Sequence, residues 1–192
     1  MTGSTRKSST AVRDELLEAT STVLERVGHE ALTVRAVAGE ARVSVVSIYN
    51  HYTDKEGLLT AIVARQFERL NSILRVLSDM GSRLDARTLL QQAAIEYRTF
   101  ALSAPQAYKL MFARRLDELP IALTAFEAFA SLVSHGQQAG AFTTTHDARS
   151  IAKVLWSACH GNALLEINGV DLDSVPSSVT DIVDFVIDGV TV

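Results

Sequence analysis

The residues around position 48 have the types and spacing needed to read base pairs in DNA. Ile48 and Tyr52 are four residues apart, so on a helix they share one face, which we expect to pack inward. An asparagine can pair with N6 and N7 of adenine, and a valine can contact the thymine methyl group. For Val45, packing into the core is an equally good interpretation. The candidates for contact with base edges are Val46, Ser47 and Asn50, with Val45 and Tyr49 at the edge of the same face.

Two short helices joined by a minimal turn would hold these side chains in place. Thr33 is placed to cap the first helix, and Ser44 to cap the second, which we expect to end near Tyr52. Arg42 and Val43 form the connection. In a DNA-binding unit of this kind, the first helix crosses the backbone and the second enters the major groove. The spacing alone is weak support, because many helical hairpins share it.

The rest of the chain also has apolar residues at helical spacing, with only 3 prolines and 10 glycines as interruptions. We therefore expect an all-α fold of about nine helices. One helix should cover residues 10–27 and stop at Gly28. Another should begin at Thr53, which with Glu56 fits a capping box, and continue to Gly81. The remaining helices are expected over residues 85–103, 105–116, 119–139, 146–167 and 177–190.

The string LTVRAVAGEARVSVVSIYNHYTDKEGLL, from Leu32 to Leu59, resembles the DNA-binding module of the tetracycline-repressor (TetR) family. One departure is Val46, where many members have a small residue. Because of this difference, the preferred base pairs of the operator cannot be predicted from the family pattern. The residues that match the family pattern are Thr33, Ala38, Val43, Ser44, Ile48, Tyr49, His51, Tyr52 and Lys55.

The resemblance implies which side chains would touch DNA. Hydroxyls, helix N-termini and lysines donate hydrogen bonds to phosphate. Arg35 would reach a base or the backbone, and Ser44 belongs to the same DNA-binding set. For His51, an ordinary surface position is the alternative. The residues expected to hold phosphates are Thr33, Ser47, Tyr49, His51 and Lys55.

The C-terminal half resembles a TetR subgroup with a Trp, His, Gly pattern, present as Trp156, His160 and Gly161 in LWSACHGNALLE. The resemblance implies a four-helix dimer bundle made by the last two helices. The expected helix over 146–167 is apolar almost all round, which fits burial against its own core and another chain. The expected domains are a disordered basic arm (1–9), a DNA-binding domain (10–70, with its helix-turn-helix at 33–52) and a ligand-binding and dimerisation domain (71–192).

Aromatic side chains between the two matched regions could line an apolar cavity, with His160 or Tyr97 as polar groups. A filled core is the alternative interpretation, and the sequence does not separate the two. The expected function is a repressor that binds a near-palindromic operator in double-stranded DNA as a homodimer and is released by a small-molecule effector. The candidate ligand-binding residues are Tyr97, Phe100, Met111, Phe112, Phe126, Phe129, Trp156 and His160.

Two other classes of protein have less support from the sequence. An enzyme has little support, because no paired carboxylates, Ser/His/Asp set or Gly-rich phosphate loop stands out. The 5 histidines show no zinc-ligand spacing, so we expect neither a metal nor a cofactor. An all-helical small-molecule-binding protein without DNA binding is the alternative, and the unbroken string from Thr33 to Lys55 argues against it. Cys159 lies among apolar residues, which favours a buried thiol over a reactive one.

The net charge of −4 is concentrated at the C-terminal end. Residues 1–55 contain 7 Lys+Arg and 7 Asp+Glu, whereas residues 141–192 contain 2 and 7. A neutral module has little electrostatic attraction for DNA, so we expect specific binding to depend on a dimer. The first ten residues include no apolar segment and no stretch is apolar enough to span a membrane, so we expect a cytoplasmic protein without membrane contact.

Overall fold

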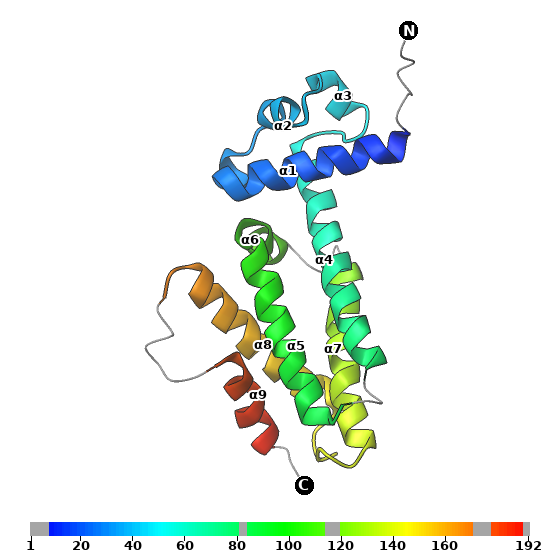
Figure 1. The fold of residues 1–192 in the computed structure, drawn as a ribbon, viewed down its shortest axis with the longest axis vertical. Helices are drawn as coiled ribbons and strands as arrows, with labels where there is room; N and C mark the ends of the chain where they lie inside the picture. The colour runs from blue at the N-terminus through cyan, green and yellow to red at the C-terminus, as the bar shows by residue number, and fades with distance from the viewer. Residues whose placement is uncertain (1–7, 81–83, 114–119, 171–177, 190–192) are drawn as a thin grey trace. The chain divides into compact units, whose positions relative to one another are not determined.

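The chain is all-helical, as the sequence predicts. The structure is a computed structural model that describes residues 8–80, 84–113, 120–170 and 178–189. These residues contain no β-strand, and none of their helices is long and apolar enough to cross a membrane. Their nine helices are α1 (Ser9–Ala31), α2 (Val34–Ala41), α3 (Val45–Tyr49), α4 (Lys55–Asp79), α5 (Ala86–Ser103), α6 (Pro105–Ala113), α7 (Pro120–Gln138), α8 (Ala148–Ile167) and α9 (Val179–Asp188) (Figure 1).

The helices form two compact units, an N-terminal unit (residues 1–66) and a C-terminal unit (residues 67–192). In the N-terminal unit, α2 packs against α1 and α3 packs against α2. Their shared core is made of aliphatic side chains at helical spacing. These are Leu16, Val23, Leu24, Val37, Ile48, Leu58 and Ile62, all essentially inaccessible to solvent.

Two helix boundaries in the N-terminal unit differ from the sequence prediction. Gly28 has φ +74°, which interrupts the helical geometry where a stop was predicted, but α1 resumes and ends at Ala31. α4 begins at Lys55 and not at Thr53. Its cap is Asp54, whose Oδ1 accepts a hydrogen bond from the backbone N–H of Gly57 at 2.8 Å. An aspartate at this position satisfies an amide of the first turn, and for this reason the helix starts two residues later than expected.

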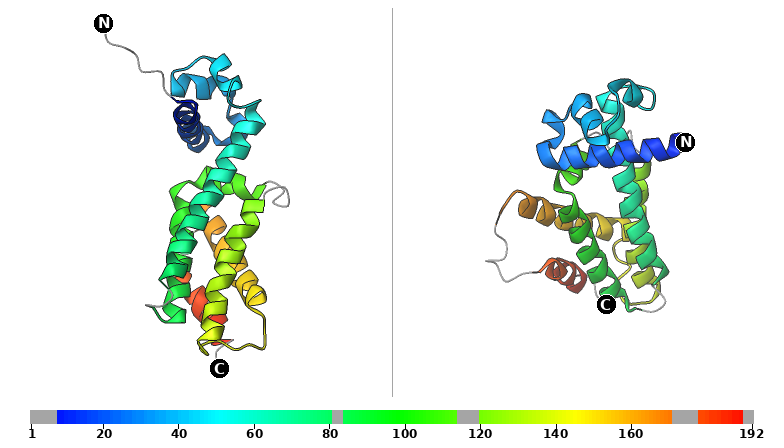
Figure 2. Two further views of the ribbon diagram at one scale, coloured as in Figure 1. Left: turned by 90° about the vertical axis from the view of Figure 1, so that its right-hand side faces the viewer. Right: turned by 45° about the horizontal axis from the view of Figure 1, so that its top comes forward.

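In the C-terminal unit, α5 packs against α7, α8 and α9, and α8 packs against both α7 and α9. Figure 2 shows these helices from two further sides, with α5 in green, α8 in orange and α9 in red. α5 and α8 each begin with an aspartate cap: Asp85 accepts from the N–H of Thr88 at 2.9 Å, and Asp147 from that of Ser150 at 3.0 Å. A helix is present in each of the five predicted ranges, 85–103, 105–116, 119–139, 146–167 and 177–190. Residues 114–116, 119, 177 and 190 of these ranges lie outside the described residues.

Candidate functional site

The predicted turn between α2 and α3 has the geometry of a helix-turn-helix. Oγ1 of Thr33 accepts a hydrogen bond from the N–H of Ala36 at 3.2 Å, and Oγ of Ser44 accepts one from the N–H of Ser47 at 3.1 Å. Both predicted caps are confirmed. Between them Arg42 adopts left-handed backbone angles (φ 55°, ψ 42°), which reverse the chain within two residues.

The side chains of α3 divide between a buried and an exposed face, as the four-residue spacing predicts. Ile48 and Tyr52 are buried. On the other side Val46 is 67% exposed and Tyr49 52% exposed. Asn50 is also exposed, whereas Val45 and Ser47 are half-buried. α3 itself is five residues long and ends at Tyr49, although the N–H of Tyr52 still donates to the carbonyl of Ile48 at 2.8 Å.

Tyr52, just after α3, connects the helix-turn-helix to α1. Its partner there is Arg13, which the sequence analysis did not predict. The hydroxyl of Tyr52 donates to the backbone carbonyl of Arg13 at 3.4 Å, and the Arg13 guanidinium lies 5.1 Å from the centre of the Tyr52 ring. Burial raises the pKa of the Tyr52 hydroxyl, which remains protonated at neutral pH. α3 is thus held against α1 by a packed ring and a backbone hydrogen bond, which fixes the direction of its exposed face.

The cations near this face differ in what they contact. Nζ of Lys55 donates to the carbonyl of Glu30 at 3.1 Å, so this ammonium group holds the last turn of α1. Arg35 and Arg42 are exposed and make no ion pair within the described ranges. Thr33 is exposed as well, and His51 is half-buried. The ten residues predicted to contact DNA therefore lie in one continuous segment, and most of them are open to solvent.

A second group of predicted residues meets in the C-terminal unit around a chain of hydrogen bonds. Nε1 of Trp156 donates to Oη of Tyr97 at 3.0 Å. The hydroxyl oxygens of Tyr97 and Tyr108 are 2.9 Å apart, and Oη of Tyr108 is 2.6 Å from Nδ1 of His160. Tyr108 was not among the predicted residues. Its position four residues before Phe112 on the same helix is the signal that places it on the same face.

Aromatic rings surround this chain of hydrogen bonds. The centre of the Phe112 ring is 4.2 Å from that of His160, and the Phe126 and Phe129 rings are 5.6 and 6.3 Å from that of Trp156. The Phe100 ring is 6.3 Å from that of Tyr108. Of the eight predicted ligand residues, all except Met111 are linked by ring contacts or hydrogen bonds. Met111 is fully buried.

The groups joined by these hydrogen bonds are uncharged at neutral pH, although the guanidinium groups of Arg69 and Arg149 lie over the rings of Phe100 and Phe126. Burial raises the pKa of both Tyr97 and Tyr108 and lowers the pKa of His160. The neighbouring Cys159 is buried, as expected, and burial raises the pKa of its thiol to about 11. No group of three or more potential metal ligands occurs in the part of the chain that the structure describes.

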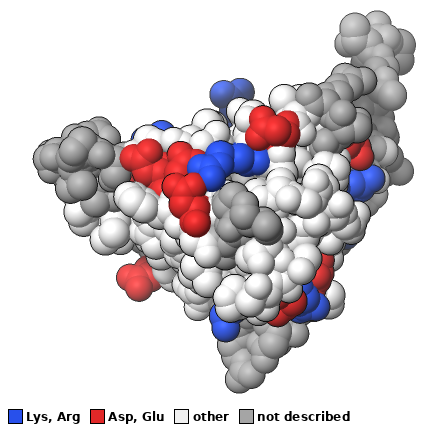
Figure 3. Space-filling model, turned by 90° about the horizontal axis from the view of Figure 1, so that it is seen from below, with Lys and Arg blue, Asp and Glu red and all other residues white. Residues whose placement is uncertain are grey.

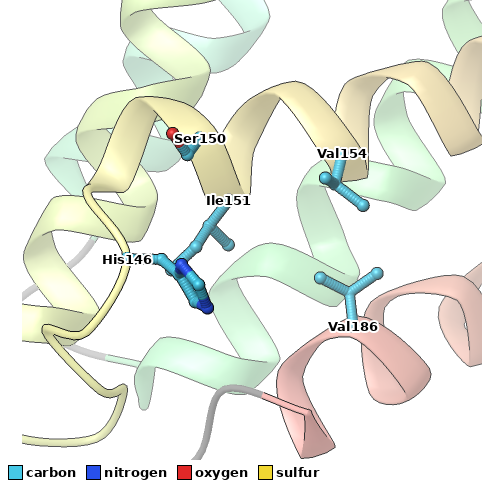
Figure 4. A pocket seen from close by; sticks show the side chains of 5 residues that line it. All are labelled: His146, Ser150, Ile151, Val154 and Val186. Carbon is cyan, nitrogen blue, oxygen red and sulfur yellow. The ribbon is translucent and has the colours of Figure 1, made fainter.

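A groove of about 320 Å³ lies between α8 and α9, outside this cluster (Figure 4). None of the predicted ligand residues lines it. Its lining is mostly apolar, and the residues are His146, Ser150, Ile151, Val154 and Val186.

Both halves of the chain match models of known protein families. Residues 16–62 match the model described as "Bacterial regulatory proteins, tetR family". Residues 90–190 match the model described as "Tetracyclin repressor-like, C-terminal domain". The first match includes the whole α2–α3 segment, and the second includes the aromatic cluster.

Similar proteins agree with these matches. An uncharacterised HTH-type transcriptional regulator of Mycobacterium tuberculosis is 30% identical over 170 residues, which are 84% of this chain and 74% of that protein. The HTH-type transcriptional repressor KstR of Rhodococcus jostii is 40% identical over 60 residues, 31% of this chain and 28% of KstR. A structure of a protein of unknown function from Rhodococcus sp. RHA1 superposes with a TM-score of 0.82 and 26% identity, covering 100% of both chains.

The N-terminal match carries the DNA-binding helices, and the C-terminal match covers more than half of the chain. This chain belongs to the TetR family of bacterial transcriptional regulators.

Proposed function

We propose that this protein is a repressor that binds a near-palindromic operator as a homodimer and is released by a small apolar ligand bound in its C-terminal unit. The main support for DNA binding is the exposed face of α3. On this face Val46, Tyr49 and Asn50 lie opposite the buried Ile48 and Tyr52. KstR, to which the DNA-binding segment is similar, is named a repressor, and this supports repression here. The proposal gives the chain no catalytic step and places it in the cytoplasm with the chromosome.

In this proposal the exposed face of α3 enters the major groove. Val46 and Asn50 would meet base edges, with Asn50 contributing about 1–3 kcal/mol of discrimination if it pairs with an adenine. Arg35 would reach a base or the backbone. Since Lys55 also holds the end of α1, its contact with phosphate would fix the position of two helices at once. The proposed contacts with the sugar-phosphate backbone are Thr33, Ser44, Ser47, Tyr49, His51 and Lys55, with Val45 at the margin of the groove.

A dimer is required because one DNA-binding unit attracts DNA weakly. Residues 1–55 contain 7 Lys+Arg and 7 Asp+Glu, so the segment carries no net positive charge. Phosphate neutralisation supplies most of the non-specific affinity for DNA. Two units whose recognition helices lie about 34 Å apart engage successive major grooves on one side of the duplex and multiply their affinities. The expected domain boundary near residue 70, within α4, forms part of this proposal.

We place the dimer interface on α8 and α9, as the resemblance to the Trp, His, Gly subgroup implies. Phe185 on α9 is 79% exposed, and Val154 on α8 is exposed beside the groove of Figure 4. Apart from the chain neighbours of Gly161 and the nearby backbone of α8, no atom lies within 4 Å of where a Cβ on Gly161 would be, so that surface of α8 is open to a second helix. Figure 3 views the molecule from below and shows broad uncharged areas between a few clusters of charge. An isologous contact between the exposed surfaces of α8 and α9 in the two protomers would give the two-fold symmetry that an inverted repeat needs.

The ligand would act by shifting the dimer between two arrangements. It releases the operator only if it binds the arrangement that does not fit DNA more tightly than the one that does. The proposed contacts are the aromatic cluster, namely Tyr97, Phe100, Met111, Phe112, Phe126, Phe129, Trp156 and His160.

Capture of genomic fragments by the purified protein, followed by sequencing, tests the proposed function. We expect enrichment of a small number of promoter fragments that share an inverted repeat. A labelled duplex of that repeat should then be shifted in a gel at a concentration at which a shuffled duplex of the same composition is not. Enrichment that is uniform across the genome, or a repeat that binds no better than its shuffled control, would contradict the proposal.

A further inference from the structure

The turn between α2 and α3 requires a backbone conformation that favours glycine, and its residue is Arg42. This residue has φ 55° and ψ 42°, and no other non-glycine residue in the described ranges has a positive φ. The N–H of Arg42 donates to the carbonyl of Gly39 at 3.2 Å, and that of Val43 donates to the carbonyl of Ala38 at 3.0 Å. These two bonds make a Schellman motif, in which the left-handed residue is usually glycine. The turn therefore uses the backbone of Arg42 and needs no side chain at this position.

The Arg42 side chain gains nothing within the fold. A left-handed residue that has a Cβ is strained, because the Cβ approaches the following carbonyl oxygen, and glycine avoids this contact. Arg42 is exposed, and among the described residues its guanidinium makes no hydrogen bond, ion pair or stacking contact. Backbone strain that the fold does not need is characteristic of functional sites. The side chain is therefore a candidate for binding a partner outside the protein.

The other cations of the N-terminal unit show that Arg42 is unusual. Residues 8–66 contain six arginines and lysines, and among the described residues only Arg35 and Arg42 contact neither an anion, a carbonyl oxygen nor a ring. Glu40, the acidic residue closest to Arg42 in the sequence, is already paired with Arg26 and does not neutralise it. The four engaged cations are Arg13 over the Tyr52 ring, Arg26 with Glu40 at 3.1 Å, Lys55 with the carbonyl of Glu30 at 3.1 Å, and Arg65 with Glu18 at 2.7 Å.

The position of Arg42 favours a contact with the sugar-phosphate backbone over a contact with bases. Arg42 lies between Ala41, where α2 ends, and Ser44, which caps α3, so it is outside the helix whose exposed face would enter the major groove. The first helix of a helix-turn-helix crosses the backbone of the duplex. A guanidinium group donates two parallel hydrogen bonds to one phosphate group. A phosphodiester is therefore the anion that matches this side chain.

We propose that Arg42 binds a phosphate of the DNA backbone from the turn of the helix-turn-helix, once in each protomer. The contact supplies affinity that does not depend on sequence and that the unit otherwise lacks, since residues 1–55 contain 7 Lys+Arg and 7 Asp+Glu. The strained backbone is retained because it holds a cation at the DNA surface. This inference rests on the proposed function, which brings α2 and α3 to DNA.

Replacement of Arg42 by glycine should stabilise the fold and weaken DNA binding at the same time. Glycine relieves the strained backbone, so the thermal midpoint of the full-length protein should rise by about 2–4 °C. Two phosphate contacts are lost per dimer, so the slope of log Kd against log salt concentration should fall by about 2, and binding at low salt should weaken about ten-fold. The probes are the duplex inverted repeat from the genomic capture and its shuffled control, each titrated by fluorescence anisotropy at several KCl concentrations.

The two duplexes distinguish a phosphate contact from a base contact. A phosphate contact carries no sequence information, so Arg42→Gly should weaken binding to both duplexes by the same factor. A loss confined to the inverted repeat would overturn the proposal, because it indicates that Arg42 reads a base. An unchanged salt slope would overturn it as well. A lower thermal midpoint would show that the fold does need this side chain, and would also contradict the proposal.

Two further variants control for strain and for net charge. Arg42→Lys keeps both the cation and a left-handed side chain, so it should restore the salt slope and show the wild-type thermal midpoint. Arg75→Ala removes an exposed cation from α4 in the C-terminal unit and changes the net charge by the same amount as Arg42→Gly. We expect its salt slope to equal that of the wild type. Equal falls in Arg75→Ala and Arg42→Gly would assign the effect to net charge and overturn the proposed contact.

The same measurements separate this proposal from the proposed function. If the wild-type protein prefers the inverted repeat but Arg42→Gly leaves the salt slope unchanged, the Arg42 contact is wrong and the repressor assignment stands. If the capture yields no repeat, or if the two duplexes bind equally, the operator assignment fails, while the salt slope on a duplex of arbitrary sequence still tests Arg42. A protein that binds no duplex at low salt would contradict both.

Discussion

The phenolic oxygen of Tyr108 on α6 lies 2.6 Å from Nδ1 of His160 on α8. The two residues are 52 positions apart in the chain, and their rings are also in contact, with centres 5.4 Å apart. This hydrogen bond therefore joins two helices that are far apart in the chain. Its consequences extend to stability, because the ring is held neutral in the folded protein.

His160 should make the folded protein less stable in mild acid. Burial lowers the pKa of His160 in the folded state below its ordinary value of about 6.5, so as the pH falls the unfolded chain takes up a proton first. Its contribution to stability is therefore complete above pH 6.5 and is lost as the pH drops through the folded-state pKa. Urea unfolding at pH values from 8 to 5 should show a steeper decline for the wild type than for His160→Gln. Both proteins retain the other 4 histidines, so parallel curves would contradict the assignment to His160.

Removal of the Tyr108 hydroxyl should destabilise the C-terminal unit. In Tyr108→Phe, both Nδ1 of His160 and the hydroxyl of Tyr97 lose a buried partner, which costs about 1–3 kcal/mol in the free energy of unfolding. Tyr49→Phe is the matched control, since Tyr49 is exposed and its change should stay within about 0.5 kcal/mol. Denaturant unfolding of the three proteins measures the difference. Equal losses in both variants would show that the buried hydrogen bonds are not the cause.

Two helical glycines should respond in opposite ways to alanine. A Cβ at Gly136 on α7 would lie 2.1 Å from Cε2 of the buried Phe142 ring, so Gly136→Ala forces that ring to move and should cost about 1–3 kcal/mol. A Cβ added at Gly161 on α8 would meet nothing within 4 Å beyond its chain neighbours and the nearby backbone of α8, so Gly161→Ala should stabilise the monomer by about 0.5–1 kcal/mol through helix propensity. Thermal unfolding distinguishes the two. A stabilised Gly136→Ala would contradict the described packing.

Local signals in the sequence predicted the helix caps and the turn of the N-terminal unit well. Thr33 and Ser44 cap their helices because a short side chain with an oxygen satisfies an amide two or three residues on, and this depends on neighbouring residues only. The same rule allows more than one choice at the start of α4, where Asp54 caps the helix although Thr53 also fits. The turn at Arg42 was placed correctly, but its left-handed backbone is not visible from an arginine.

The long-range contacts could not be predicted in the same way. Arg13 meets Tyr52 across 39 residues, and Tyr108 meets His160 across 52, and neither pair shares a local pattern. The sequence predicts that the faces of α5, α6 and α8 are apolar, not which polar atoms on those faces meet. The unpaired oxygen of Asn71 is likewise a property of the packed fold.

The exposed phenyl ring of Phe185 tests the proposed dimer interface. Phe185→Lys places a charge where we expect burial against a second chain and should raise the dissociation constant of the dimer by at least about ten-fold. Lysine near the C-terminal end of α9 is compatible with the helix dipole, so the fold should be retained. Val76→Lys, at an exposed position near the end of α4, is the control and should leave the dimer intact. Sedimentation velocity at several concentrations measures the dissociation constants of both variants. An intact dimer in Phe185→Lys would show that the interface does not include this residue.

Tyr49 tests the proposed DNA contact without disturbing the fold. Its ring is half-exposed on α3, opposite the buried Ile48, so Tyr49→Ala removes surface area and a hydroxyl but no core packing. Operator binding in a gel shift should weaken by about ten-fold, since one lost contact per protomer occurs twice in the dimer. Sedimentation should show an unchanged dimer, and the thermal midpoint should stay close to that of the wild type. Unchanged affinity in a folded, dimeric Tyr49→Ala would exclude this residue from the interface and require α3 to meet DNA through another face.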